Sequence, residues 1–338
     1  MIKFLLRRLV TMAVTLLIIS ALVFLIIKLP PGDFLSNQIA ELRAQGEAAS
    51  AAKAEFLIKQ YGLDRPVWEQ YLVWIGVWPG PNGFSGLLQG DWGWSFEFDK
   101  PVHEVVGDAL WLTLLVNLAV VVFVHLVSIP IAIYSATRQY SAGDYFATLL
   151  GYLGLATPNF LLALILLYYM NRWFGVSIGG LYDAQYAGQP WTWAKVQSLL
   201  SHLIVPTLVI GLGGTAAMIR RMRANLLDEL GKQYYVTAKA KGLPPTRALV
   251  KYPFRMSLNP FIADIGNLLP HLVSGSVLVS LVLSLPTVGP ILLAALKSQD
   301  QFLAGFILMF VAVLTVVGML ISDLLLAWLD PRIRLGGR

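Results

Sequence analysis

The sequence predicts an all-α polytopic membrane protein with six transmembrane helices. Of its 338 residues, 57% are hydrophobic and only 13% are charged, whereas about a quarter of the residues in a soluble domain carry a charge. Six segments are long and apolar enough to cross a bilayer, which takes about 20 residues in a helix. Lysine and arginine are concentrated between and beside these segments. The composition therefore excludes an ordinary soluble domain.

The six predicted spans follow one another along most of the chain. They are Leu9–Leu29, Ala109–Ala136, Tyr145–Met170, His202–Ile219, Pro260–Leu285 and Phe302–Leu329. The first follows the basic start MIKFLLRR, which also begins a signal peptide. Its apolar run is too long for a signal peptide, however, and no small-residue cleavage site follows it. We therefore expect it to remain as the first transmembrane helix.

The basic residues predict the orientation. Six spans place both termini on one side, and nine lysines and arginines lie between spans four and five. Because positive charge favours the cytoplasmic side, both termini and the loop 220–259 are predicted to be cytoplasmic. The predicted division is then a tail with the first span (1–30), an external segment (31–106), and a core with spans two to six (107–338).

Both external segments are expected to contain local structure. Ile39–Tyr61 is rich in helix-forming residues, and Val67–Trp78 is an amphipathic, aromatic stretch that suits the membrane surface. A glycine- and proline-rich turn follows at 79–83. The second outer loop, Arg172–Ser201, also carries tryptophans. Anchoring at the bilayer surface and contact with an external partner both remain open for these aromatic residues.

Motifs for covalent chemistry are absent from the sequence. It has no cysteine, no GxxxxGK[ST] phosphate-binding loop, no HExxH metal motif and no GxSxG nucleophile motif. Its four histidines are scattered. Basic residues do not alternate with aromatic residues as in a nucleic-acid-binding surface. We therefore predict no catalytic residue, no metal site, no cofactor bound by this chain and no nucleic-acid partner.

Two acidic residues lie inside predicted spans, Asp264 and Asp323. A carboxylate at membrane depth is costly and tends to face a bundle interior or an aqueous path. Asn267 and His271 follow Asp264 at spacings that share one helical face. These three residues are candidates for the translocation path. Structural hydrogen bonding and a shifted span boundary remain the alternatives.

The loop between spans four and five contains the stretch GKQYYVTAKAKGLPP, residues 231–245. Arg220–Lys232 is expected to extend span four as a charged helix, and Tyr234–Lys241 to form a short separate helix. Gly242 suits a left-handed helix stop, and Pro244 and Pro245 prevent continuation. Such a helix can dock on a cytoplasmic partner. An ordinary basic loop is the alternative.

This stretch resembles the coupling-loop motif of ABC importer permeases of the dipeptide/oligopeptide type. The matching residues are Tyr235, Val236, Thr237, Ala238, Lys239, Ala240, Lys241, Gly242 and Leu243. Further matches occur in order along nearly the whole chain, at Pro31–Asp33, Tyr61–Trp74, Gly90–Phe96, Ala156–Phe160 and Asp330–Arg334.

The resemblance implies a type I ABC importer permease fold and a transmembrane subunit of an ATP-driven, binding-protein-dependent importer. It also implies its partners: a second permease, two cytoplasmic ATPase subunits that hold ATP and magnesium, an external solute-binding protein and the lipid of a bacterial-type inner membrane. The residues of the coupling loop would receive the motion of the ATPases. This chain would form half of the path for a peptide-like solute.

The family pattern is not matched everywhere. Ser280, Leu285 and Thr287 stand where the family often has Glu, Trp and Gly. Members of this permease type also import oligosaccharides, opines and nickel, so these substrates remain alternatives. A gated channel and a membrane enzyme are rivals from other classes, but the sequence shows neither a charged selectivity ring nor a polar catalytic cluster.

Overall fold

The computed structural model describes residues 2–29, 39–41, 43–44, 48–81, 83–174, 179–186 and 188–329. Its contacts divide the chain into two compact units. The first unit comprises Met1–Arg8, Leu112–Gly289 and Leu314–Arg338, and the second comprises Leu9–Trp111 and Pro290–Val313. Several long helices run from one unit into the other. The predicted domain boundaries at residues 30 and 106 were drawn instead near the ends of predicted membrane spans. They stay a prediction.

The described chain is helical and apolar, as predicted. Four helices are long and apolar enough to cross a membrane, and a bent helix pair raises the number to five, counted over the described residues. They begin with α1 (Ile2–Lys28) and α5 (Val102–Thr137) and continue with α8 (Trp193–Leu230) and α14 (Gln301–Leu329). The fifth predicted span matches α12 (Asn259–Val282). A polytopic α-helical fold is thus confirmed, while the number six stays a prediction.

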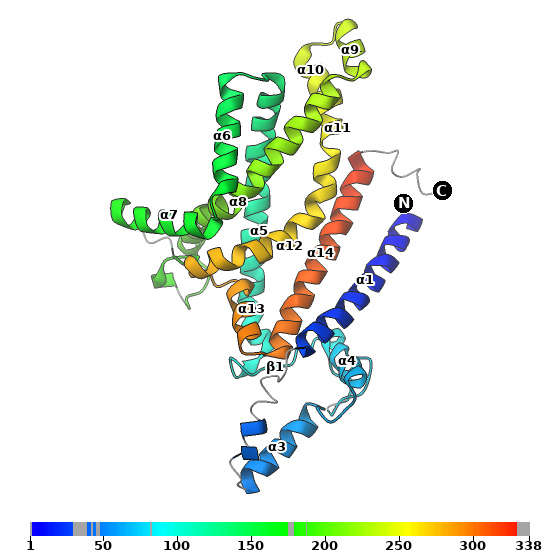
Figure 1. Cartoon of the computed structure of the whole chain (residues 1–338), viewed down its shortest axis with the longest axis vertical. Helices are drawn as coiled ribbons and strands as arrows, with labels where there is room; N and C mark the ends of the chain where they lie inside the picture. Colours follow the sequence, from blue (N-terminus) through cyan, green and yellow to red (C-terminus); the bar gives the residue numbers. More distant parts are fainter. Residues whose placement is uncertain are drawn as a thin grey trace. The chain divides into compact units, whose positions relative to one another are not determined.

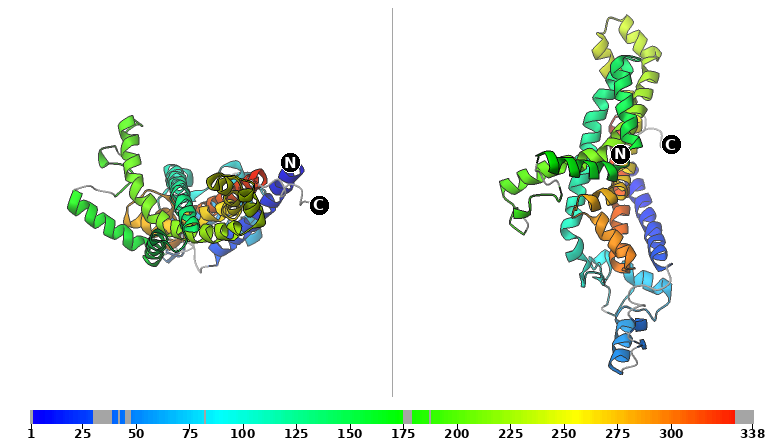
Figure 2. Two further views of the ribbon diagram at one scale, coloured as in Figure 1. Left: turned by 90° about the horizontal axis from the view of Figure 1, so that it is seen from above. Right: turned by 60° about the vertical axis from the view of Figure 1, so that its left-hand side comes forward.

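The third predicted span is broken in the middle. It consists of α6 (Ala142–Ala156) and α7 (Asn159–Phe174), which meet at an angle of 98°. Pro158 lies at the break and cannot donate a backbone hydrogen bond, and it disfavours helical geometry at Thr157, which is extended (φ −87°, ψ 121°). The prediction of one continuous helix was therefore wrong. Figure 2 shows α7 turned sideways from α6.

The core of the first unit lies mainly between α5, α8 and α12. Its buried members include Val120, Val209 and Val279, none of which is exposed to solvent. The approach of α5 to α8 is close because position 211 is glycine. A Cβ there would lie 2.7 Å from the Phe123 ring. Along α8, α6 packs with Gly151 against Ala216. Small residues allow such close helix packing in membranes.

The second unit combines parts of α1 and α14 with the segment that follows α1 in the sequence. This segment contains α3 (Ala48–Gln60), α4 (Val67–Ile75), the short 3₁₀ helix η1 (Leu87–Gln89) and a two-stranded antiparallel ribbon, β1 (Trp94–Ser95) with β2 (Lys100–Pro101). The helix α13 (Val288–Lys297) precedes α14. The helices expected around 39–61 and 67–78 are present but shorter in the described chain, and the ribbon was not predicted.

Aromatic side chains hold the second unit together. Phe24 of α1 contacts the rings of Tyr71 and Trp74 of α4, each at 5.6 Å between centroids. Trp92 stacks on Phe306 of α14 at 4.1 Å. The predicted amphipathic helix α4 therefore buries part of its aromatic face against protein.

A buried carboxylate links the ribbon to α14. Asp300 has no exposed surface, and it accepts hydrogen bonds from Ser95 Oγ (2.7 Å), Glu97 N (3.1 Å) and Leu303 N (3.2 Å). The last of these caps the first turn of α14. A buried charge with three donors is satisfied without a cation. One residue therefore joins segments about 200 positions apart.

Candidate coupling site

The candidate coupling site stands on an extension of α8. This helix has 38 residues, which at 1.5 Å per residue span about 57 Å, far more than the roughly 30 Å of hydrocarbon. Figure 1 shows α9 (Gln233–Ala240) directly after α8, beside α10 (Pro245–Leu249). The expected charged extension and the short separate helix are both present.

The end of α9 has the geometry that the sequence predicted. Gly242 adopts φ +81°, in the left-handed region. Its N–H donates to the carbonyl of Lys239 (2.9 Å), and the N–H of Leu243 donates to the carbonyl of Ala238 (3.2 Å). These two bonds form a Schellman motif, which satisfies the last carbonyls of a helix. The expected stop at Gly242 is confirmed.

The inner face of α9 is held by the returning chain. Tyr235 and Ala238 are buried, and they pack with Ala248 of α10, which has no exposed surface. Leu243, the residue after the left-handed glycine, belongs to the same apolar cluster. Pro244 precedes α10 and Pro245 is its first residue, a position that proline favours. The short helix is therefore packed against the chain segment that returns from it.

The outer face of α9 is exposed. Tyr234 is 38% and Val236 is 47% exposed, and the Lys239 ammonium lies 4.5 Å from the ring centroid of Tyr235. Thr237, Ala240 and Lys241 are exposed as well. This face combines small, apolar and basic groups, which suits insertion into a groove of a protein partner.

The return to the membrane contains irregular turns. A π-helical turn, η3 (Val250–Phe254), includes Pro253 and follows α10, and α11 (Arg255–Ser257) leads into α12. A π turn widens a helix locally and commonly accommodates a proline or a functional bend. The coupling site is thus connected directly to α8 on one side and to α12 on the other.

An ion pair ties this region to α6. Arg223 of α8 donates to Asp144 through Nε (2.9 Å) and Nη2 (2.7 Å), and the Asp144 side chain is 4% exposed. Asp144 also accepts from the N–H of Tyr140 (3.0 Å), whose φ of +62° is unusual for a residue with a side chain. Ser141 caps the first turn of α6. The bidentate pair connects the start of α6 to the extension of α8.

For the candidate path residues, the structure describes the helix but not the side chains. Asp264, Asn267 and His271 belong to α12, but their side chains lie outside the described part of the structure. Their role stays a prediction. Asp323 of α14 pairs with Arg8 of α1 at 2.6 Å, and its neighbour Ser322 donates to the carbonyl of Ile262.

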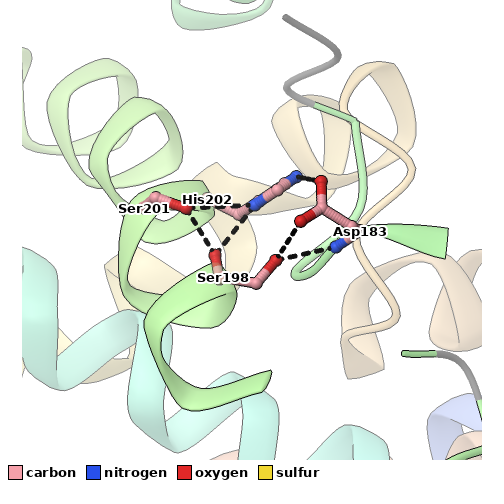
Figure 3. A network of polar contacts seen from close by, with 4 residues as sticks. All are labelled: Asp183, Ser198, Ser201 and His202. Atoms are coloured by element: carbon pink, nitrogen blue, oxygen red, sulfur yellow. Dashed lines mark hydrogen bonds and ion pairs between the residues drawn. The ribbon is translucent and has the colours of Figure 1, made fainter. Parts of the chain in front are cut away.

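Sequence reasoning missed a polar network at the other end of α8 (Figure 3). Ser198 Oγ donates to Asp183 Oδ2 (2.8 Å), and Asp183 Oδ1 lies 3.7 Å from Nε2 of His202. His202 Nδ1 lies 2.8 Å from the carbonyl oxygen of Ser198. Ser198 Oγ contacts the carboxylate rather than the imidazole, and Ser201 Oγ lies 3.5 Å from His202 Nδ1 but donates to the carbonyl of Ser198 (2.7 Å). The close contacts of a nucleophile with a base are therefore not made by either serine. The network connects the loop that precedes α8 to the first turns of this helix. The C-terminal part of the predicted loop Arg172–Ser201 is helical, since α8 begins at Trp193.

Metal chemistry has no support in the described part of the chain, where no three potential ligand side chains from His, Cys, Asp and Glu gather. His202 is a buried, hydrogen-bonded residue, and the ring nitrogen Nδ1 of His125 lies 2.8 Å from a backbone carbonyl of its own helix.

These features define a class: a polytopic membrane protein whose longest helix ends in a rigid, exposed helix suited to a partner. Comparison with protein families gives the particular family. Residues 128–335 match the binding-protein-dependent transport system inner membrane component, and residues 1–119 match the N-terminal part of the same kind of membrane component. The chain belongs to this family.

Relatives match over almost the full chain. It is 34% identical to the oligopeptide transport system permease protein AppB of Bacillus subtilis, over 98% of this chain and 99% of the relative. It is 28% identical to the dipeptide transport system permease protein DppB of Escherichia coli K12, over 99% of each chain. The predicted ABC importer permease is thereby confirmed, as is the prediction that this subunit is not itself an enzyme.

Proposed function

We propose that this chain forms half of the path for a peptide-like solute and that its α9 is the surface on which ATPase subunits act. The names of the two relatives support a peptide substrate. The peptide assignment is preferred over oligosaccharide, opine or nickel because both similar proteins carry peptide names. A second permease subunit would complete the path, and an external binding protein would deliver the solute.

The observation that carries the proposal is the packing of α9 against Ala248 of α10 and Leu230 of α8. A push on the exposed face around Val236 passes through Tyr235 and Ala238 into Ala248, which lies beneath them. From there it reaches α8 and α12 through continuous helix and tight turns. Rigid-body movement of helices changes the side from which the path is accessible. The distribution of basic residues supports a cytoplasmic location for both termini and α9.

The test compares two glycines at the two ends of α9. Gly242 has positive φ, and a Cβ there would meet no atom within 4 Å, so a substitution acts through backbone strain alone. Gly231 has φ −80° and accepts a side chain. A residue forced into the left-handed region costs about 1–2 kcal/mol, and a β-branched one is disfavoured more strongly.

We expect Gly242→Val to lose most peptide uptake in the reconstituted transporter, and Gly231→Ala to retain it. The measurement is peptide uptake together with ATP hydrolysis stimulated by the loaded binding protein. Co-purification of the ATPase subunits controls for assembly. Normal uptake by Gly242→Val in a normally assembled complex would contradict the coupling role.

A further inference from the structure

The second unit contains a cavity of about 370 Å³, lined by residues of that unit alone. This volume lies within the range of small-molecule sites, which are mostly apolar with a few polar groups that orient the ligand. Its walls include Phe24 at the end of α1, Trp74 of α4 and Phe302 of α14. These three segments are far apart in the sequence. Among the described residues, none of α9 lines the cavity.

Several polar groups of the cavity can donate hydrogen bonds. Lys28 and Arg65 contribute positive charge, and Tyr61, Gln60 and Trp94 contribute neutral donors. Both hydrogen bonds of Arg65 to Glu69 and Pro79 use Nη1, so its Nε and Nη2 have no partner within the described residues. A set of donors beside positive charge favours a ligand that carries acceptors and negative charge.

The only carboxylate among the described lining residues is already engaged. Asp91 accepts from the hydroxyl of Ser85 and from the N–H of Gly93 (3.0 Å). It therefore fixes the loop and offers little to a cationic ligand. Within the described residues, Nε and Nη2 of Arg65 thus remain as donors for a ligand.

The hydroxyl of Tyr61 is a second donor for a ligand. Its ring is held by Phe96 (5.1 Å) and Phe302 (5.9 Å), yet its hydroxyl has no hydrogen-bond partner among the described residues. Burial raises the pKa of this hydroxyl, and the negative charge of Asp99 raises it further. The hydroxyl is thus protonated at neutral pH and available to donate to a ligand.

We propose that this cavity binds a small carboxylate with an apolar body, with Tyr61 and Arg65 as donors to the carboxylate and Phe24, Trp74 and Phe302 around the apolar part. Two sources share this chemistry, the free carboxyl end of a short apolar peptide and a fatty acid of the bilayer. The proposal does not depend on the coupling role of α9.

The experiment measures binding to the full-length chain in lipid nanodiscs, with the subunits that co-purify and without a solute-binding protein. Trp74 and Trp94 line the cavity, so their fluorescence reports occupancy, and calorimetry gives the affinity. The probes are N-acetylphenylalanine, its amide and acetate. Alanylphenylalanine and decanoate distinguish the two sources, because each supplies the carboxylate on a different apolar body.

We expect saturable binding of N-acetylphenylalanine. The amide should bind at least about tenfold more weakly than the acid, because it loses charge-assisted hydrogen bonds. Acetate should also bind weakly, because it leaves the apolar walls uncovered. Tyr61→Phe should weaken binding by about 2–10-fold, the value of one hydrogen bond. Tyr71→Phe is the matched control, since the Tyr71 hydroxyl contacts Ser20 and does not line the cavity.

Equal binding of the acid and its amide would overturn the proposal, as would the absence of saturable binding by any carboxylate probe. Unchanged affinity in Tyr61→Phe would overturn the assigned donor. Tyr61→Phe removes no hydrogen bond between described residues, so the variant protein is expected to fold normally. Gln60→Glu is a second variant, at an exposed residue, and its negative charge should weaken binding of a carboxylate by repulsion.

Discussion

The coupling segment and the ribbon segment reach defined structures in different ways. In the coupling segment, α9 and its return are specified by neighbours in sequence: Gly242 ends the helix and Pro244 starts the return. In the ribbon segment, Trp94–Pro101, the decisive partner is Asp300, about 200 positions away. Local rules therefore specify the coupling segment, for which we propose a partner, while distant contacts specify the part around the cavity.

The largest effect is expected from Asp300→Ala. It leaves Ser95 Oγ and two backbone N–H groups without their acceptor in a buried place, and unsatisfied buried donors cost about 1–3 kcal/mol each. We expect the ribbon segment to lose its protection against limited proteolysis while α9 keeps its own. Asp300→Asn keeps the size of the side chain and one acceptor oxygen, so its protection against proteolysis should lie between that of the wild type and that of Asp300→Ala. Wild-type protection in Asp300→Ala would show that distant contacts do not determine this segment.

A smaller effect is expected from the pair that connects α6 to α8. Asp144→Asn removes the charge that faces Arg223, and breaking a buried ion pair costs about 3–5 kcal/mol, less here because Arg223 is 25% exposed. We expect a lower midpoint of thermal unfolding and reduced uptake per ATP hydrolysed.

The matched control for that pair is the exchange Asp144→Arg with Arg223→Asp. Recovery of uptake per ATP in the exchanged variant, relative to each single charge reversal, would show a mechanical link between the helices. If the exchange restores the unfolding midpoint but not the coupling, the pair serves stability alone.

The smallest effect is expected from Arg8 and Asp323. Arg8 is 44% exposed, and an exposed ion pair contributes about 0–1 kcal/mol. Arg8→Gln should shift the unfolding midpoint little. A large loss of stability would indicate that this pair is shielded in the assembled transporter.

The difference between local and distant specification also explains what could be predicted. The stop at Gly242, the extension of α8 and the membrane fold follow from glycine geometry, charge and hydropathy. The bend at Pro158 had a signal, the Thr157–Pro158 pair, but hydropathy is continuous across it. The pairings of Asp300 with Ser95 and of His202 with Asp183 had none, because polar residues do not specify which distant neighbour they will meet. The cavity has the same origin, since its walls come from three distant segments.

The most direct test of the coupling role is photo-crosslinking from the two ends of the connected helices α8 and α9. A photoreactive residue at Val236 lies on the exposed face of α9, and one at Trp193, 79% exposed, lies at the start of α8. In the assembled transporter, Val236 is predicted to crosslink to the ATPase subunits and Trp193 is not. Crosslinks from Trp193 to the ATPases, with none from Val236, would contradict the account.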